Sequence, residues 1–554
     1  MSDLTNVQNP ENLGTNAGTI EILPKDLERF DSVDHPNHDL IPQKERPSSR
    51  ILFIGLPNGG SRPGKAGLFL PLGLAYVTAA LKERGYTYDC IDLHTEQIMQ
   101  KRPFDFWNRI QDFDLSSYDL IAFGGVFLKF EDLQYLSGRI RENYGHIFQV
   151  VGGNMATMTP DVMLERTQVD CVCLYEGEET IIELIQTLEK GGDWKEVKSI
   201  KYRDENGQPV ESPSRPKLTA EKVPNLPDRE SWNFELIRKA YPVGSPGRYS
   251  AVAFASRGCP FTCTFCKPLT GKEIRSREID SIINEIKYLK EKWNVQYVRF
   301  FDEVFIGSKY RIKALCEAMI EEKLNIFWWC QTQVRLIDED LLKTMKKAGC
   351  IEIAYGVESG SDTMLDDMKK GISADIIRDV LEATDRSGIR ITLNLLAGTP
   401  AETVNTLKET RDFLISLNHI NWANIPSIEF VVPLPGTELF DTAVKMDLIE
   451  NPKAYVVEAL AKMDKYSKSI NMTTMSSEEF ITTVEKFNKD IAQDFYKKHP
   501  LRYLLSVFNL DHLRWGLILH NFSFRQVIPL LDSLVWATIG KHMHNFSKRT
   551  QKHT

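Results

Sequence analysis

The chain has 554 residues, which predicts two or three domains rather than a single one. Hydrophobic residues make up 42% and charged residues 26%, as in globular proteins, and this excludes a largely disordered chain. The formal net charge of −8 gives no general attraction for phosphate backbones, so we expect no nucleic-acid partner. The nine cysteines are an odd number spread along a long chain, which is unlike a secreted disulfide framework and indicates a reducing, cytoplasmic location.

Residues 1–47 are polar and rich in Asn, Pro, Asp and Glu, which predicts a flexible N-terminal tail and not a signal peptide. We expect no membrane span. The most apolar segment, residues 527–540, is too short to cross a bilayer and contains Pro529 and Asp532.

Residues 48–200 alternate between strand and helix patterns. Buried, β-rich runs predict strands at residues 51–56, 88–93, 119–125, 148–153 and 169–174, and amphipathic runs predict helices at 71–84, 131–142, 160–166 and 178–190. This alternation is typical of a parallel sheet with helices on its faces, so the first domain is predicted to be Rossmann-like.

Glycine-containing loops follow several of these strands, at the edge where sheets of this class bind ligands. No Gly-x-Gly-x-x-Gly follows the first strand, so a dinucleotide is not indicated, and plain tight turns are an alternative reading. The candidate ligand contacts in these loops are Pro71, Leu72, Gly73, Gly124, Gly125, Gly152, Gly153, Asn154, Glu176 and Gly177.

Three cysteines stand close together at Cys259-x3-Cys263-x2-Cys266, directly after the apolar run 251–255. Thiolates hold iron–sulfur clusters, and three of them leave one iron of a four-iron cluster without a protein ligand. An open coordination position is what distinguishes a catalytic metal centre from a structural one. A zinc knuckle with a distant fourth cysteine, or three buried thiols, are the alternatives.

The rest of the chain divides into three parts. Residues 201–245 contain a turn and a Pro-rich stretch and are predicted to be a linker. Residues 246–440 carry six strand patterns with helices between them, which predicts six β/α units; these strands are expected at 251–256, 296–302, 326–332, 351–357, 389–396 and 425–432. Residues 441–554 are predicted to be helical.

The helical C-terminal region begins with a capping box at residues 476–479, and a helix is expected from near Ser477 to about Tyr496. Two more helices are expected at about 501–520 and 524–544. A packed helical end domain is the simplest interpretation, and a lid over the barrel or a peripheral membrane contact are the alternatives.

The first domain resembles the cobalamin-binding domain found at the front of many radical SAM enzymes. The resemblance lies in the Pro-Leu-Gly-Leu loop at Pro71, the Val-Gly-Gly at 151–153 and the Glu-Gly-Glu-Glu-Thr at 176–180. An Asp-x-His-x-x-Gly motif, which in many cobalamin domains places a histidine on cobalt, is absent after the first strand. Asp92 and His94 follow the second strand and are interpreted as a surface feature, so we expect no histidine ligand.

The cysteine motif, with Arg257 and Gly258 before it and Phe265 within it, is similar to the signature of radical SAM enzymes. The six β/α units of residues 246–440 resemble the partial (β/α)6 barrel of that family more than a closed eight-unit barrel. This resemblance implies that Cys259, Cys263 and Cys266 hold a 4Fe-4S cluster whose open iron binds S-adenosylmethionine. Reductive cleavage of the bound S-adenosylmethionine would give a 5′-deoxyadenosyl radical. Residues at later strand ends then become SAM contacts by the same resemblance: Phe265, Asp302, Glu303, Gln331, Arg335, Glu358, Ser359, Thr399, Pro433 and Leu434.

With cobalamin as a second cofactor, the resemblance implies methylation of an unactivated carbon of a small-molecule, lipid or peptide substrate. Radical cyclisation or ring rearrangement without methyl transfer is one alternative, and a radical reaction without cobalamin is another. A methylthiotransferase is disfavoured because the first domain lacks three clustered cysteines. A non-catalytic iron–sulfur or zinc-binding protein is the alternative from a different class, and such a protein would not need the polar residues at the later strand ends. A reductant such as flavodoxin or ferredoxin is the expected partner.

Overall fold

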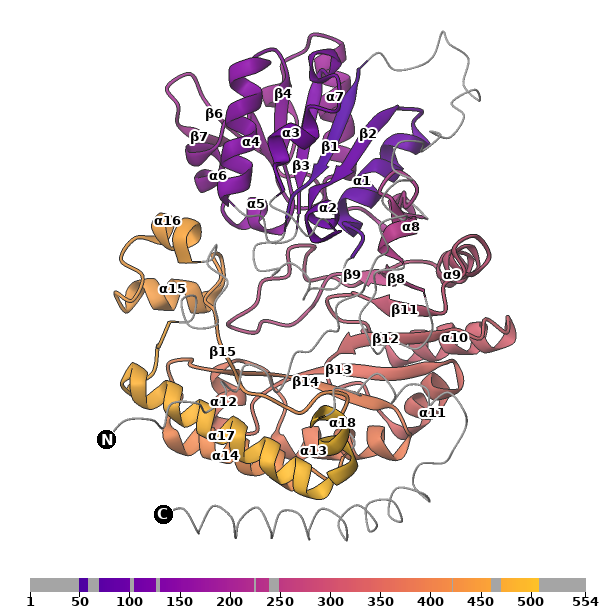
Figure 1. The fold of residues 1–554 in the computed structure, drawn as a ribbon, viewed down its shortest axis with the longest axis vertical. Coiled ribbons are helices and arrows are strands. Elements are labelled where there is room, and N and C mark those ends of the chain that lie inside the picture. The colour runs from indigo at the N-terminus through magenta and orange to yellow at the C-terminus, as the bar shows by residue number, and fades with distance from the viewer. Residues whose placement is uncertain are drawn as a thin grey trace.

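The computed structural model describes residues 49–57, 69–99, 104–125, 130–223, 226–238, 249–420, 422–459 and 470–507. A first domain stands on a larger central domain, and helices of the C-terminal region lie beside the central domain (Figure 1). The expected tail at 1–47 and the expected third C-terminal helix lie outside the described residues.

The first domain is built on a seven-stranded sheet of order β2-β1-β3-β4-β5-β6-β7. The first five strands pair in parallel, and β6 and β7 add an antiparallel hairpin. Its strands are β1 (Ile51–Gly55), β2 (Tyr88–Asp92), β3 (Leu120–Gly124), β4 (Phe148–Val151), β5 (Cys171–Cys173), β6 (Ile200–Arg203) and β7 (Pro209–Glu211).

Helices cover both faces of this sheet because successive strand residues alternate between two cores. In β1, Ile51 and Phe53 join one buried cluster, while Leu52 and Ile54 join the other. The helices are α1 (Leu72–Glu83), α2 (Leu93–Met99), α3 (Phe106–Ile110), α4 (Phe130–Asn143), α5 (Asn154–Met158), α6 (Pro160–Arg166) and α7 (Glu178–Glu189), with 3-10 turns at Leu115–Ser117 and Trp194–Glu196. The doubly wound architecture predicted for this part of the chain is confirmed.

The central domain is built on a six-stranded sheet of order β15-β14-β13-β12-β11-β8, in which every pair of neighbours is parallel. β8 and β15 stand at opposite edges and do not pair with each other, so the sheet is a partial barrel, as expected. Its strands are β8 (Ser250–Ala253), β11 (Tyr297–Phe300), β12 (Phe327–Thr332), β13 (Cys350–Glu358), β14 (Arg390–Ala397) and β15 (Glu429–Phe430).

Amphipathic helices connect these strands and bury their apolar sides on the outer face of the sheet. They are α9 (Ile279–Trp293), α10 (Lys309–Glu321), α11 (Glu339–Lys347), α12 (Asp362–Asp367), α13 (Ala374–Arg386) and α14 (Val404–Ser416). A short ribbon of β9 (Ser256–Arg257) and β10 (Arg275–Ser276) follows β8.

The two domains share one hydrophobic core. Residues 212–223 and 226–238, which include a 3-10 turn (Ala220–Lys222) and α8 (Phe234–Ile237), run between the sheets and pack on α1. Trp232 Nε1 donates a hydrogen bond to Thr78 Oγ1 at 3.1 Å, and the Tyr88 hydroxyl donates to Asp228 at 2.7 Å. The first sheet ends at Glu211 of β7, past the boundary expected at residue 200. The chain after Glu211 leads from the first domain to the central domain.

The C-terminal region begins with α15 (Glu438–Lys445), α16 (Pro452–Ala454) and a π turn (Tyr455–Ala459), and continues with α17 (Ser477–Lys498) and α18 (Pro500–Val507). The expected helix near Ser477 is confirmed as α17. It packs along α14 and buries Phe480, Val484, Phe487, Ile491 and Phe495, as a packed end domain requires. Within the described residues no helix is long and apolar enough to span a membrane.

Candidate functional site

The three cysteines of the motif lie on one loop at the carboxyl end of β8, between β9 and β10. β9 and β10 pair through Arg257 and Arg275, so a two-residue ribbon closes the base of the loop. Gly258 has a φ of 101°, and a Cβ there would lie 2.0 Å from the Glu273 carbonyl oxygen. The loop backbone therefore requires glycine directly before Cys259, because no side chain fits there.

The thiols of this loop, here called the cysteine loop, are accessible and influence one another. Cys259 and Cys263 are half-buried and Cys266 is exposed. Burial raises the pKa of Cys266 to about 11, and the neighbouring Cys263 and Cys259 add to this rise. Three thiols that repel one another as thiolates are a donor set that needs a cationic group between them.

In the described parts of the chain, no three His, Cys, Asp or Glu side chains converge closely enough to hold a single metal ion. A cluster differs from a single ion, because each thiolate binds its own iron and the sulfurs need not converge on one point. The three thiols of the cysteine loop could each bind one iron of such a cluster, whereas a zinc knuckle takes four protein ligands on one ion.

Asp302, expected to contact SAM, is fully buried at the end of β11. Its carboxylate accepts hydrogen bonds from the Ser256 hydroxyl at 2.6 Å and from the Ala255 N–H at 3.0 Å. Burial raises the pKa of Asp302 to about 6, although these hydrogen bonds act to lower it. The carboxylate holds the start of the cysteine loop, and its contact with SAM stays a prediction.

Three other predicted SAM contacts lie around the cysteine loop. Glu303 accepts a hydrogen bond from the Gly258 N–H at 2.7 Å and another from the Thr270 hydroxyl. Arg335 lies over the ring of Phe261, with the guanidinium carbon 5.2 Å from the ring centroid. Gln331 donates to the carbonyl oxygen of Asp302 at 2.8 Å and so lies one residue from Glu303.

Lys370 is a residue of this site that the sequence did not reveal. Its ammonium group is buried and lies 3.2 Å from the carboxylate of Glu358 and 5.8 Å from the ring centroid of Phe265. Burial raises the pKa of Glu358, and Lys370 opposes that rise. Lys370 also acts to lower the pKa of Cys263, although burial of that thiol outweighs it. No motif marks Lys370, since it follows an ordinary helix, α12.

The remaining predicted SAM contacts are engaged within the fold. Ser359 exchanges a 2.8 Å hydrogen bond with Thr410 of α14, and the Thr399 hydroxyl donates to Asp367 of α12 at 2.8 Å. Pro433 and Leu434 accept hydrogen bonds through their carbonyl oxygens, from Tyr455 and Thr437. These contacts order the strand ends on which any SAM-facing backbone would lie.

Glycines let backbone segments come close together at the carboxyl edge of the first sheet. Gly153 has a φ of 108°, and a Cβ there would lie 2.3 Å from the Gly125 carbonyl oxygen, so the loops after β3 and β4 touch backbone to backbone. A Cβ on Gly124 would lie 2.6 Å from Leu74 of α1. The glycines therefore let α1 and the ends of β3 and β4 approach one another, and a cobalamin contact at this edge stays a prediction.

Other predicted cobalamin contacts have different surroundings. A Cβ on Gly73 would meet nothing within 4 Å, and both Gly73 and Asn154 are exposed. Pro71 precedes α1, and its carbonyl oxygen accepts the first hydrogen bond of that helix, from Ala75. Leu72 is buried in the core. Gly152 and Gly177 lie near the side chain of Cys173 at the end of β5.

Glu176 has its carboxylate occupied by the central domain. It accepts hydrogen bonds from Arg257 at 2.8 Å and from Arg275 at 2.9 Å. Burial acts to raise the pKa of Glu176, but the two arginines outweigh it and hold the pKa below its usual value. A cobalamin contact of this side chain stays a prediction.

His94 is buried, with 6% of its surface exposed, so its interpretation as a surface feature is wrong. It is the second residue of α2, close to Asp92, which accepts hydrogen bonds from the His94 N–H at 3.1 Å and from the Thr95 hydroxyl. Burial lowers the pKa of His94 to about 4, so the imidazole is neutral at pH 7. The Asp92 side chain caps α2, which explains the Asp-x-His spacing by local structure.

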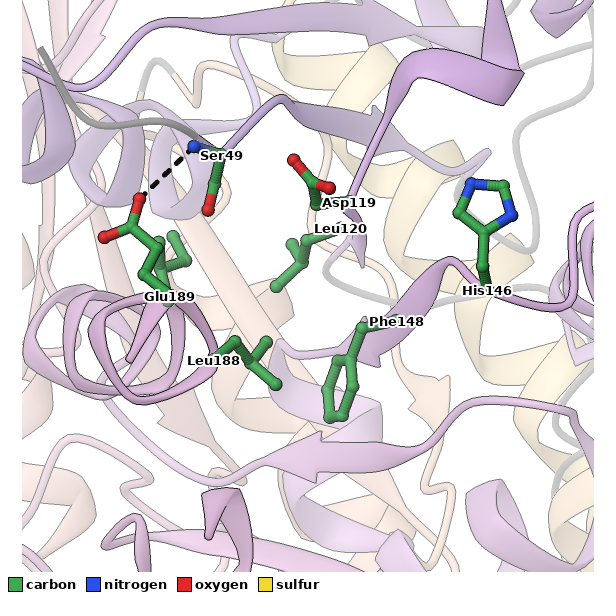
Figure 2. A pocket seen from close by; sticks show the side chains of 8 residues that line it. Ser49, Asp119, Leu120, His146, Phe148, Leu188 and Glu189 are labelled. Carbon is green, nitrogen blue, oxygen red and sulfur yellow. Dashed lines mark hydrogen bonds between the residues drawn. The ribbon is translucent and has the colours of Figure 1, made fainter. Parts of the chain in front are cut away.

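A cavity of about 430 Å³ lies in the first domain at the opposite edge of the sheet. Its lining includes Asp119 and Phe148, at the starts of β3 and β4, together with Ser49 and Glu189 (Figure 2). The Ser49 N–H donates to Glu189 at 3.3 Å across one side of the cavity. This cavity lies at the amino ends of the strands, so it is separate from the glycine loops at their carboxyl ends and from the cysteine loop.

Comparison with known protein families agrees with both sites. The Radical SAM superfamily model matches residues 254–414, which include the cysteine loop and strands β11 to β14. The B12 binding domain model matches residues 66–185, which include the glycine loops.

Relatives and solved structures cover both domains. An uncharacterized methyltransferase of Pyrococcus horikoshii is 29% identical over 382 residues, which cover 68% of this chain and 79% of the relative. An anaerobic magnesium-protoporphyrin IX monomethyl ester cyclase of Rubrivivax gelatinosus is 27% identical over 75% of this chain and 74% of its own. The radical S-adenosylmethionine methyltransferase TsrM from Kitasatospora setae, solved with cobalamin and a [4Fe-4S] cluster, has the same fold, with a TM-score of 0.63, 17% identity and coverage of 79% of this chain and 91% of TsrM. The chain belongs to the radical SAM enzymes that carry an N-terminal cobalamin-binding domain.

Proposed function

We propose that this enzyme is a cobalamin-dependent methyltransferase that acts on an unactivated carbon of a small-molecule, lipid or peptide substrate. When bound, the cluster with SAM supplies a 5′-deoxyadenosyl radical that removes a hydrogen atom, and cobalamin supplies a methyl group. The observation that carries this proposal is the direct contact between the cysteine loop and the carboxyl edge of the first sheet, where Arg257 meets Glu176. The substrate carbon is then expected between the two domains.

The residues of the cysteine loop have distinct tasks in this proposal. Cys259, Cys263 and Cys266 would each hold one iron, which leaves the fourth iron for the amino and carboxylate groups of SAM. Glu303 fixes the loop through the Gly258 N–H. Lys370 places a positive charge beside the thiols, which would carry negative charge once they bind iron.

Aromatic side chains line the inner face of the barrel beneath the first domain. The ring of Phe69, which precedes α1, lies 5.4 Å from that of Phe301, and Phe301 lies 5.7 Å from Trp329. Arg299 stacks on the Trp329 ring at 4.4 Å. A packed aromatic layer at this interface excludes water, as chemistry with a reactive radical requires.

A second candidate function, radical cyclisation or rearrangement without methyl transfer, has support from the Rubrivivax cyclase, which matches both domains of this chain. The methyltransferase of Pyrococcus covers a similar share at a similar identity. The two reactions differ in the fate of the methyl group, and this difference can be measured directly.

We further propose a one-electron reductant of the flavodoxin or ferredoxin type and a cytoplasmic location. Both follow from the chemistry, because cleavage of SAM consumes an electron and a cluster of this kind persists only in a reducing environment.

The radical step is tested by anaerobic reconstitution with iron and sulfide, followed by SAM and dithionite. We expect 5′-deoxyadenosine from the wild type and none from Cys263→Ala, because the loss of one thiolate removes an iron ligand. Cys90→Ala is the control, since Cys90 is a half-buried cysteine of β2 outside the loop, and it should match the wild type. If Cys263→Ala forms as much 5′-deoxyadenosine as the wild type, the radical assignment is wrong.

The same reaction with methyl-labelled SAM and cobalamin decides between the two functions. The visible spectrum after reconstitution reports whether cobalamin is retained. Candidate metabolites are tested as substrates. Methyl transfer puts the labelled methyl group into the product, whereas cyclisation changes the mass of the product without adding label. A protein that cleaves SAM but retains no cobalamin would contradict both.

A further inference from the structure

Two arginines at the base of the cysteine loop reach across the domain boundary to two glutamates. Arg257 and Arg275 stand opposite each other in the β9–β10 ribbon. Glu176 and Glu178 belong to the segment that leads from β5 into α7 of the first domain. We call these four residues the interdomain clamp.

The contacts of the clamp are short and buried. Arg257 Nη1 lies 2.8 Å from Glu176 Oε1, and Arg257 Nη2 lies 2.6 Å from Glu178 Oε1, so one guanidinium bridges both carboxylates. Arg275 Nη1 lies 2.9 Å from Glu176 Oε2. The four side chains are between 5% and 12% exposed. Salt bridges on protein surfaces are weak and mobile, but these are neither exposed nor singly bonded.

The charges of the clamp balance, with two arginines against two glutamates. Burial acts to lower the pKa of Arg257, but Glu178 and Glu176 outweigh it and raise that pKa. Glu178 also begins α7, where a negative charge is favourable at the helix N-terminus. Removal of one member leaves an opposite charge buried without compensation, so the arrangement is held in one geometry.

The clamp connects the two segments that carry the proposed cofactor contacts. Arg257 is two residues from Cys259, and the residue between them, Gly258, is fixed by Glu303. On the other side, Gly177 separates the two glutamates, and Gly152 at the end of β4 and Gly177 both lie near Cys173 of β5. A shift of α7 would therefore be transmitted to the first cysteine through two short contacts.

Attachment of the domains does not depend on the clamp. Arg277 of the central domain donates a hydrogen bond to the Tyr76 hydroxyl of the first domain at 3.4 Å, and the shared buried cluster contains side chains of both domains. These contacts would hold the domains together without the clamp. We therefore expect the clamp to affect the position of the cysteine loop and not the attachment of the domains.

We propose that the interdomain clamp positions the cysteine loop against the carboxyl edge of the first sheet and so sets the separation between the cluster and cobalamin. The clamp residues are positioning residues, and this role rests on the proposed function for its consequences in the loaded enzyme. The geometry itself can be tested in the protein without cofactors.

The test compares two adjacent glutamates. Glu178→Gln breaks the contact with Arg257, whereas Glu179→Gln breaks a contact with Arg84 inside the first domain, at 2.7 Å. In hydrogen–deuterium exchange of the apo-protein, Glu178→Gln is expected to speed exchange about tenfold both in residues 256–276 and in residues 174–178, since a buried charge loses its partner. Glu179→Gln should leave residues 256–276 unchanged.

The loaded enzyme gives a spectroscopic readout. Reduced cluster and cob(II)alamin are both paramagnetic, so the cluster enhances the spin relaxation of cobalt in a distance-dependent way. We expect weaker and more heterogeneous enhancement in Glu178→Gln, with 5′-deoxyadenosine formation retained, and wild-type enhancement in Glu179→Gln. A purely structural role would lower cofactor content and activity together and leave the relaxation of the loaded fraction unchanged, which would overturn the proposal.

Arg275→Gln is a second variant in case Glu178→Gln does not fold, because it leaves the Arg257 contacts in place. It should produce the same paired rise in exchange. Wild-type exchange in both variants, or equal changes in Glu179→Gln, would refute the clamp. If the wild type binds no cobalamin or cluster, the proposed function fails, and the exchange result alone still decides on the clamp.

Discussion

Glu402 is a buried carboxyl group beside the end of β14, with 2% of its surface exposed. Burial raises its pKa to about 7, against hydrogen bonds from the Thr406 hydroxyl and the Gly398 N–H. The folded protein therefore keeps a proton that the unfolded chain loses near its ordinary pKa of 4.5. The resulting stability is fully present below about pH 4.5 and is lost as the pH rises through about 7.

Replacement of this carboxyl group by an amide removes that pH dependence. We expect Glu402→Gln to gain stability relative to wild type as the pH rises from about 5 to 8, by at most about 3 kcal/mol. Urea unfolding of both proteins across this range measures the difference. Parallel curves for the two proteins would show that Glu402 is ionised in the fold.

At single positions, the sequence predicts which residues lie near the site better than it predicts what they contact. Asp302 and Glu303 are adjacent and equally acidic, yet one is fully buried on Ser256 and the other is exposed beside Gly258. Lys370 carries no motif, because a buried lysine is specified by its distant partner Glu358. Such pairings depend on the tertiary fold, which a local pattern does not contain.

The capped start of α17 provides a test at the scale of one element. Ser476 accepts a hydrogen bond from the Glu479 N–H at 3.2 Å, and Ser477 is the first residue of the helix. Both serines are exposed, so they differ mainly in this cap. Ser476→Ala is expected to destabilise the first turns of α17 by about 1 kcal/mol, because a backbone N–H loses its partner.

Hydrogen exchange of α17 amides measures this effect. Ser477→Ala is the matched control and should change the local stability by less than about 0.5 kcal/mol. Equal effects of the two substitutions would mean that the cap does not set the start of this helix.

Elements with strong periodic patterns were predictable, and those without them were not. The capping box and apolar spacing of α17 predict its start and its buried face. The strands β6 and β7 are short, Ile200 is their one buried residue, and their residues resemble a turn-rich linker. Their place in the first sheet comes from pairing with β5, a partner distant in the chain.

At the scale of the whole molecule, the shared core predicts cooperative unfolding. One buried cluster contains Tyr76 of the first domain, Trp232 of the connecting segment and Ile282 of the central domain. Separation of the domains would expose this surface, so we expect one thermal transition for both. Differential scanning calorimetry with domain-resolved exchange checks this, and two well-separated transitions would contradict it.

The order of domains and the class of each sheet could be predicted from the alternation of strand and helix patterns. The contact between the domains could not, since Arg257 and Glu176 are 81 residues apart and either could equally be a solvated surface charge. Complementary charges are recognised as partners only when the fold brings them together.

The ribbon that closes the cysteine loop has a consequence for the life of the enzyme in air. Protein contacts hold the base of the loop, through the β9–β10 pair, the Cys259 N–H on the Gly271 carbonyl oxygen and the Glu303 carboxylate on the Gly258 N–H. Zinc fingers, in contrast, unfold when their metal leaves, because the metal supplies the folding energy. None of these contacts involves a thiol, so we expect an enzyme that loses iron to oxygen to keep the base of its loop, and repair to require delivery of iron and sulfide rather than refolding of the chain.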